Sequence, residues 1–121
     1  MALAIDSHQR LVVCDSCNHR IQIFSLEGDF IQSIGAVGSG AGELKYPYDL
    51  ALDDEDNIFV CEYGNSRIQK FTSEGVSLWA LGAPGRAGGE FFSPWGVEVL
   101  SPTTFVVADS GNNRLEIIRI H

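Results

Sequence analysis

The chain has 121 residues, of which 45% are hydrophobic and 20% charged, and its formal net charge is −8. This size suits one small domain, and the excess of acidic groups argues against nucleic-acid binding, which depends on basic side chains that neutralise phosphates. No stretch approaches the ~20 apolar residues of a membrane helix, and the N-terminal residues lack the pattern of a signal peptide, so the compartment stays open with the cytoplasm favoured.

A twelve-residue phrase occurs three times at a constant interval of 47 residues. The copies begin at Val13, Val60 and Val107 and read VCDSCNHRIQIF, VCEYGNSRIQKF and VADSGNNRLEII. A fixed period of this length is typical of arrays of stacked supersecondary units.

Short β-rich runs separated by polar turns predict eleven strands, and no helical pattern of useful length is present. In chain order the predicted strands span residues 3–5, 11–14, 20–24, 30–34, 48–52, 58–61, 67–71, 76–81, 96–99, 105–108 and 114–120. The tight turns between them favour antiparallel hairpins. The chain is therefore predicted to form two four-stranded meanders followed by three further strands.

Two Gly-rich segments, 35–46 and 82–93, join these units and align with each other through a shared Gly-Glu-hydrophobic pattern. Because the pattern repeats, we expect both connectors to be structured. The predicted organisation is a first unit at 1–34, a connector at 35–46, a second unit at 47–81, a connector at 82–93 and an incomplete third unit at 94–121. A four-stranded sheet must bury a face against a neighbour, and radial repetition of such sheets gives a propeller of four to eight blades.

The repeated phrase resembles the NHL repeat. Its acid-x-x-Asn-x-Arg core comprises Asp15, Asn18 and Arg20; Glu62, Asn65 and Arg67; and Asp109, Asn112 and Arg114. The connector pattern from Gly42 to Pro47, repeated from Gly89 to Pro94, also matches. The resemblance implies an all-β fold, a partial β-propeller of about 2.75 four-stranded antiparallel blades of a type that is usually six-bladed when complete.

Eleven strands are roughly half of what a six-bladed ring requires. We interpret the chain as a piece of a larger propeller protein. The alternative is self-association, in which copies of the chain complete a ring and cover the sheet edges that a lone copy would leave open.

The acid, Asn and Arg of each phrase are interpreted as structural. Asn tolerates the backbone of a tight turn, and the acid and Arg flank that turn, where an exposed ion pair would contribute ~0–1 kcal/mol. A group needed for catalysis would not recur in every repeat, so this triplet is expected to shape the blade.

No catalytic, cofactor or metal site is predicted. His8, His19 and His121 share no spacing suited to a metal, and Cys14 and Cys17 form a C-x-x-C without the second half of a zinc site. The acidic turn 53–56 lacks the glycine and distal Glu of an EF-hand calcium loop. Asp49 and Glu98 lie near the inner strand ends, where some propeller lyases and lactonases hold metal ligands, but they do not align with each other.

Aromatic residues gather where the connectors enter the second and third units. If exposed, they would form a surface for a protein or peptide; if buried, they would be wedges between blades, which is the interpretation that we favour for Phe91 and Trp95. The residues expected to contribute to partner binding are Tyr46, Tyr48, Arg86, Trp95, Asn18, His19, Asn65 and Asn112.

The predicted function is a non-catalytic scaffold that binds a protein or peptide partner on the face formed by the connectors and the motif turns. Two alternatives remain open. In the first, the chain is the structural portion of a propeller enzyme of the lyase or lactonase type. In the second, it is an RNA-binding NHL module, an alternative that the net charge of −8 disfavours.

Overall fold

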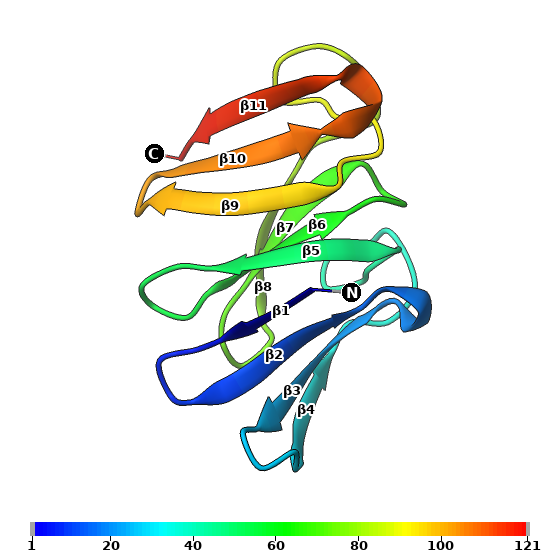
Figure 1. Cartoon of the computed structure of the whole chain (residues 1–121). Helices are drawn as coiled ribbons and strands as arrows, with labels where there is room; N and C mark the ends of the chain where they lie inside the picture. The colour runs from blue at the N-terminus through cyan, green and yellow to red at the C-terminus, as the bar shows by residue number, and fades with distance from the viewer. Residues whose placement is uncertain (1, 121) are drawn as a thin grey trace.

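The computed structural model describes residues 2–120, which form eleven strands in three antiparallel sheets (Figure 1). The first sheet contains β1 (Ala2–Ile5), β2 (Arg10–Asp15), β3 (Arg20–Ser25) and β4 (Phe30–Ile34). The second contains β5 (Pro47–Leu52), β6 (Ile58–Glu62), β7 (Arg67–Phe71) and β8 (Ser77–Leu81). The third contains β9 (Gly96–Ser101), β10 (Thr104–Asp109) and β11 (Arg114–Arg119). The only helical segments between residues 2 and 120 are two 3-10 turns, η1 (Ser16–Asn18) and η2 (Ser110–Asn112).

Each sheet is a meander in which consecutive strands pair, so the predicted architecture of two full blades and three strands of a third is confirmed. Several strands extend one or two residues beyond the predicted bounds. The extension at the β6–β7 hairpin comes from the pairing of Glu62 with Arg67, and Asp15 with Arg20 extends the β2–β3 hairpin in the same way. The strands therefore continue to these charged residues, because the acid and the Arg are paired across the hairpin.

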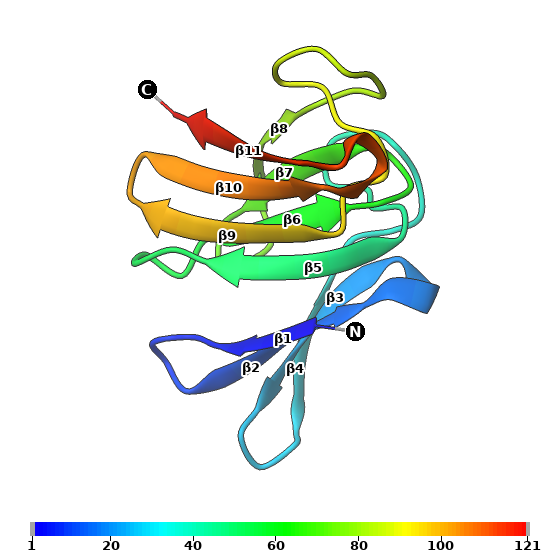
Figure 2. The ribbon, with the colours of Figure 1, turned by 45° about the horizontal axis from the view of Figure 1, so that its top comes forward.

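The three sheets are arranged around a common centre. Their first strands β1, β5 and β9 lie side by side and contact in sequence, whereas β4 and β8 lie outermost (Figure 1, Figure 2). The carboxylate of Asp49 in β5 accepts a hydrogen bond from the backbone N–H of Val97 in β9, at 3.1 Å. This radial order is the arrangement of propeller blades.

Apolar side chains fill the space between successive blades. Between the first and second blades the core includes Val12, Ile21, Leu50 and Phe71, and between the second and third it includes Phe59, Ile68, Val97 and Phe105. Each core also contains one fully buried residue from the connector that joins its two blades. This residue is Leu44 in the first core and Phe91 in the second.

The prediction that Phe91 is a wedge between blades is therefore confirmed, whereas the same prediction for Trp95 is wrong, because Trp95 is 60% exposed. Phe91 belongs to the connector, whose backbone turns it inward: its N–H and C=O bond to Ala83 and Gly85. Trp95 directly precedes β9 on the surface.

Two of the three cysteines belong to these cores. Cys14 and Cys61 are buried, and the Cys14 thiol donates to the carbonyl of Pro47 at 2.9 Å, whereas Cys17 is exposed. Burial raises the pKa of Cys14 to about 12 and that of Cys61 well above its usual value. The C-x-x-C pair thus has one thiol in the core and one at the surface.

A thiol-labelling experiment follows from this difference. Because the thiolate is the reactive form, we expect the folded protein at pH 8 to react rapidly with one equivalent of Ellman's reagent, at Cys17, and with three equivalents after unfolding in urea. Cys17→Ser should abolish the rapid phase. A second fast equivalent in the folded protein would contradict the burial of Cys14 and Cys61.

Candidate functional site

The acid–Asn–Arg triplet of the second blade holds the connector that precedes the blade. Glu62 is fully buried and accepts from Arg67 Nε at 2.6 Å and from Asn65 Nδ2 at 2.8 Å. The remaining donors of Arg67 reach the carbonyls of Ser39, Gly40 and Glu43, and Asn65 also donates to Gly38. One residue triplet therefore fixes the Gly-rich connector through its backbone.

The third blade repeats this arrangement with the second connector. Asp109, also fully buried, accepts from Arg114 Nε at 2.9 Å and from Asn112 Nδ2 at 2.8 Å. Arg114 donates to the carbonyls of Arg86, Ala87 and Glu90, and Asn112 to that of Gly85. The two connectors have the same path because the same donors hold the same backbone positions.

The first blade has the triplet without a connector among the described residues. Asn18 and Arg20 both donate to Asp15 at 3.0 Å, and these hydrogen bonds, that of Asn18 first, lower the pKa of Asp15. The Arg20 side chain is 39% exposed, against 11% for Arg67. The prediction that the acid and the Arg form an exposed ion pair therefore holds only for the first blade. In the other two blades a connector covers the carboxylate.

In the second and third phrases, one further residue that the sequence interpretation missed also holds the connector. Gln69 accepts from the Gly42 N–H at 2.7 Å and donates to the Glu43 carbonyl, and Glu116, 47 residues later, accepts from the Gly89 N–H at 2.6 Å. The signal was present in the sequence, since Gln22, Gln69 and Glu116 occupy the same place in the three phrases.

An aromatic patch lies at the connector end of the blades; we define it as Tyr46, Tyr48, Tyr63, Trp95 and the adjacent His19. Tyr48 stacks on Tyr63 with ring centres 4.8 Å apart and lies 6.2 Å from Trp95. His19 meets Tyr46 edge-on at 4.4 Å, and its Nδ1 accepts the Tyr46 N–H at 2.9 Å. Tyr46, Tyr48 and Trp95 are 44%, 38% and 60% exposed, so the patch presents rigidly supported aromatic surface to solvent.

The structure places four of the residues predicted to bind a partner in two aromatic contacts, His19 with Tyr46 and Tyr48 with Trp95. Arg86 and Asn112 lie apart from them at the third blade, where both line a pocket of about 290 Å³ with Arg114. Asn65 serves the connector, and Asn18 is bonded to Asp15. Tyr63, which lies in a motif turn, was not predicted.

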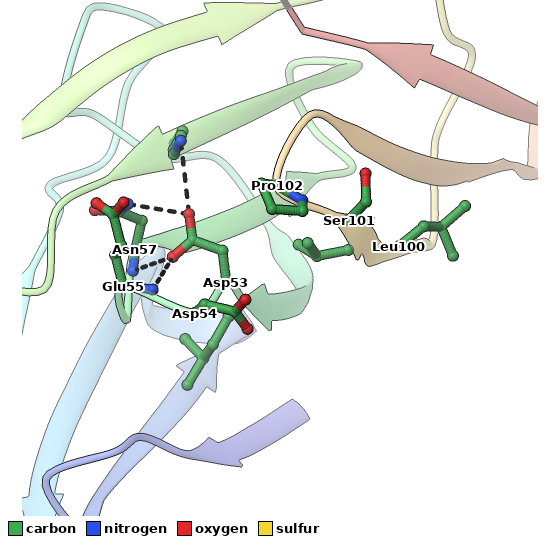
Figure 3. A pocket seen from close by; sticks show the side chains of 10 residues that line it. Asp53, Asp54, Glu55, Asn57, Leu100, Ser101 and Pro102 are labelled. Carbon is green, nitrogen blue, oxygen red and sulfur yellow. Dashed lines mark hydrogen bonds and ion pairs between the residues drawn. The ribbon is translucent and has the colours of Figure 1, made fainter.

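A second pocket, of about 490 Å³, lies at the opposite end of the second and third blades, and Asp53, Asp54, Glu55 and Asn57 line one side of it (Figure 3). Asp53 accepts from the backbone of Glu55 and Asn57 and pairs with Lys70 Nζ at 3.6 Å. Asp56 accepts from the backbone and hydroxyl of Ser7 in the first blade, which lowers its pKa. These two carboxylates are thus engaged in stabilising the turn and the blade contact.

The residues considered for catalysis do not gather. Asp49 bonds to the Val97 N–H between inner strands, Glu98 is exposed and bonds its neighbour Val99, and His19 belongs to the aromatic patch. Within residues 2–120, no three His, Cys, Asp or Glu side chains are placed to hold one metal ion. The same residues include no helix with the length and hydrophobicity needed to cross a bilayer.

Radially ordered meanders, with connectors held by a repeated triplet, define a segment of a β-propeller. Residues 4–80 match the model of a family described as 6-bladed beta-propeller (DUF5128), and the chain belongs to this family. A segment of 34 residues, 28% of the chain, is 44% identical to the RING finger protein nhl-1 of Caenorhabditis elegans and corresponds to 4% of that protein. The repeats are thus of the NHL type.

Solved propellers have the same fold at low sequence identity. The chain resembles a streptogramin B lyase (TM-score 0.71, 17% identity, 99% of this chain and 40% of that one). It also resembles the virginiamycin B lyase of Staphylococcus aureus (0.69, 13%, 98% and 40%) and a protein of unknown function from Bacteroides thetaiotaomicron (0.72, 11%, 97% and 34%). The chain spans well under half of the length of these structures.

Proposed function

We propose that this chain is a non-catalytic propeller scaffold that binds a protein or peptide partner through the aromatic patch. The observation that carries the proposal is the cluster in which the exposed Tyr48 stacks on the half-buried Tyr63 beside the exposed Trp95, on a frame held by buried hydrogen bonds. Tyr and Trp dominate the binding energy of protein interfaces, because they bury a large rigid surface together with a polar group.

The acids and arginines of the repeated motif support a non-catalytic role. Glu62 and Asp109 are fully buried, and their arginines are bonded to connector carbonyls, so these groups act on the frame of the blade. The alternative of a propeller enzyme rests on the lyase folds, whose identity of 13–17% supports the shared fold alone.

The net charge of −8 and the composition of the patch favour a protein or peptide over RNA. Stacking on Tyr and Trp would suit a base as well as a side chain, but RNA affinity depends on phosphate neutralisation. A peptide with apolar or aromatic side chains can pack on the Tyr and Trp rings, and it needs no basic groups on this chain.

A peptide-display experiment tests the proposal. Peptides selected from a random phage-displayed library on the folded chain should bind Trp95→Ala more weakly by about tenfold or more, and Tyr48→Ala similarly. Both variants should keep the free energy of unfolding within about 1 kcal/mol, since exposed positions tolerate truncation.

Phe30→Ala is the matched control, because Phe30 is an aromatic residue 59% exposed on β4, away from the patch. Its affinity for the selected peptides should equal that of the wild type. Unfolding of Trp95→Ala, or selected peptides that bind it unchanged, would contradict a partner site at the patch.

A further inference from the structure

A cation held by two aromatic rings and a carboxylate already occurs within the second blade. The ammonium group of Lys70 lies 5.1 Å from the centre of the Phe59 ring and 6.0 Å from that of Trp79. It is also 3.6 Å from the carboxylate of Asp53. The two rings are 5.8 Å apart and inclined at 80°. Because the face of an aromatic ring is electronegative, such a ring pair attracts a cation, and the carboxylate adds to the attraction.

The aromatic patch contains a second ring pair of this kind, and this one is exposed. The ring centres of Tyr48 and Trp95 are 6.2 Å apart and inclined at 52°, and Tyr63 stacks on Tyr48 and supports it. Within residues 2–120, the Lys70 ammonium is the only cation that lies over an aromatic ring. The pair of Tyr48 and Trp95 is therefore open to a cation from a partner.

A carboxylate accompanies this ring pair as well. Asp49 directly follows Tyr48 in β5, and its Oδ2 accepts the N–H of Val97, two residues after Trp95, at 3.1 Å. The same oxygen lies 3.6 Å from the place that a Cβ on Gly96 would take. Asp49 is half-buried, and its Oδ1 has no hydrogen bond to any of residues 2–120. One carboxylate oxygen beside the rings is thus left for a ligand.

On the basis of the function proposed above, we propose that the partner of the aromatic patch presents an arginine side chain. Its guanidinium lies against Tyr48 and Trp95 and donates a hydrogen bond to Oδ1 of Asp49. Arginine suits this site better than lysine, because the planar guanidinium stacks on aromatic faces and is more weakly hydrated than an ammonium. Asp49 thereby acquires a role in recognition, in place of the metal-ligand role considered from the sequence.

Two basic side chains adjoin the patch in sequence, and neither lies over its rings. Arg20 pairs with Asp15 at 3.0 Å, and the stem of Lys45 lies against Gly64. A guanidinium from the partner therefore meets no competing cation on the ring pair. The net charge of −8 also favours the approach of a basic peptide.

The probes are the peptides selected on the folded chain from the random phage-displayed library whose binding is weakened in Trp95→Ala. We expect these peptides to share an arginine. Replacing that arginine with citrulline, which keeps the shape and removes the charge, should weaken binding to the wild type about tenfold or more. Replacing it with lysine should weaken binding about threefold or more. Isothermal titration calorimetry of the synthetic peptides measures the dissociation constants.

Asp49→Asn tests the other half of the contact, because it keeps an oxygen for the Val97 N–H and removes the charge. It should weaken binding of the arginine peptide about tenfold and leave binding of the citrulline peptide unchanged, since both changes remove the same interaction. Asp54→Asn is the matched control. It removes the same charge from an exposed residue at the opposite end of the blade, and it should leave both affinities unchanged.

Urea denaturation should show that Asp49→Asn is folded. If it is not, the wild type alone tests the pairing, because added salt should weaken binding of the arginine peptide more than that of the citrulline peptide.

Three results would overturn the proposal. Peptides that depend on Trp95 but need no arginine, or that bind Asp49→Asn as they bind the wild type, would leave the patch as a partner site without the guanidinium contact. Equal binding of the lysine and arginine peptides would identify an ammonium site instead. Selected peptides whose binding does not depend on Trp95 would contradict the proposed function as well.

Discussion

Glu62→Gln is expected to lower the free energy of unfolding by about 3–5 kcal/mol, because it removes the charge of a buried ion pair and leaves Arg67 without its partner. The Glu62 carboxylate accepts from Arg67, Asn65, Gln69 and the Lys45 N–H. A neutral amide adds two donors where only donors are present, so the loss extends to the connector that Arg67 holds. Urea denaturation at one fixed protein concentration measures the change.

Asp15→Asn is the matched control, since it makes the same kind of change at the same place in the first blade. The Asp15 side chain is 15% exposed and its Arg20 is 39% exposed, whereas Glu62 is fully buried. We therefore expect a loss of at most about 1 kcal/mol. Equal losses in the two variants would show that covering by the connector does not determine the strength of the motif.

Phe91→Ala is expected to cost about 3–5 kcal/mol of stability, the usual effect of removing a buried Phe without collapse of the site. Phe91 fills the space between the second and third blades, with its ring close to Gly82, and contacts the cluster of Phe59, Val97 and Phe105. The loss should appear as a lower urea midpoint with an unchanged slope.

Phe92→Ala provides the comparison at the next position. Phe92 is 53% exposed, and its backbone, which the substitution keeps, bonds to Asp109 and Gly111. The expected loss is within about 1 kcal/mol. If the two substitutions were equally costly, the connector backbone rather than the Phe91 side chain would hold the blades together.

The sequence predicted the strands well because their signals are local. Alternation, polar turns and the 47-residue period all lie within one repeat, and each repeat confirms the others. The ends of the strands were less accurate, since residues such as Glu62 enter the ladder through a partner on the next strand.

The candidate site was predicted less completely. His19, Tyr46, Tyr48 and Trp95 were named from the sequence, but Tyr63 was missed because its place in a motif turn gives no sign of the ring stacked on it. The connector positions alone gave the same expectation for Phe91 and Trp95, one of which is buried and the other exposed.

The sequence by itself determined the repeat, the meander and the propeller class, because these follow from the order of apolar, polar and turn residues along one strand after another. Only the tertiary structure decided that the Asn and Arg of the motif hold the connectors, and that aromatic residues from separate segments form one surface. Those contacts join residues 15 or more positions apart, such as Tyr48 with Tyr63, Arg67 with Ser39 and His19 with Tyr46. The periodic pattern alone does not say which of these side chains meet when the blades pack.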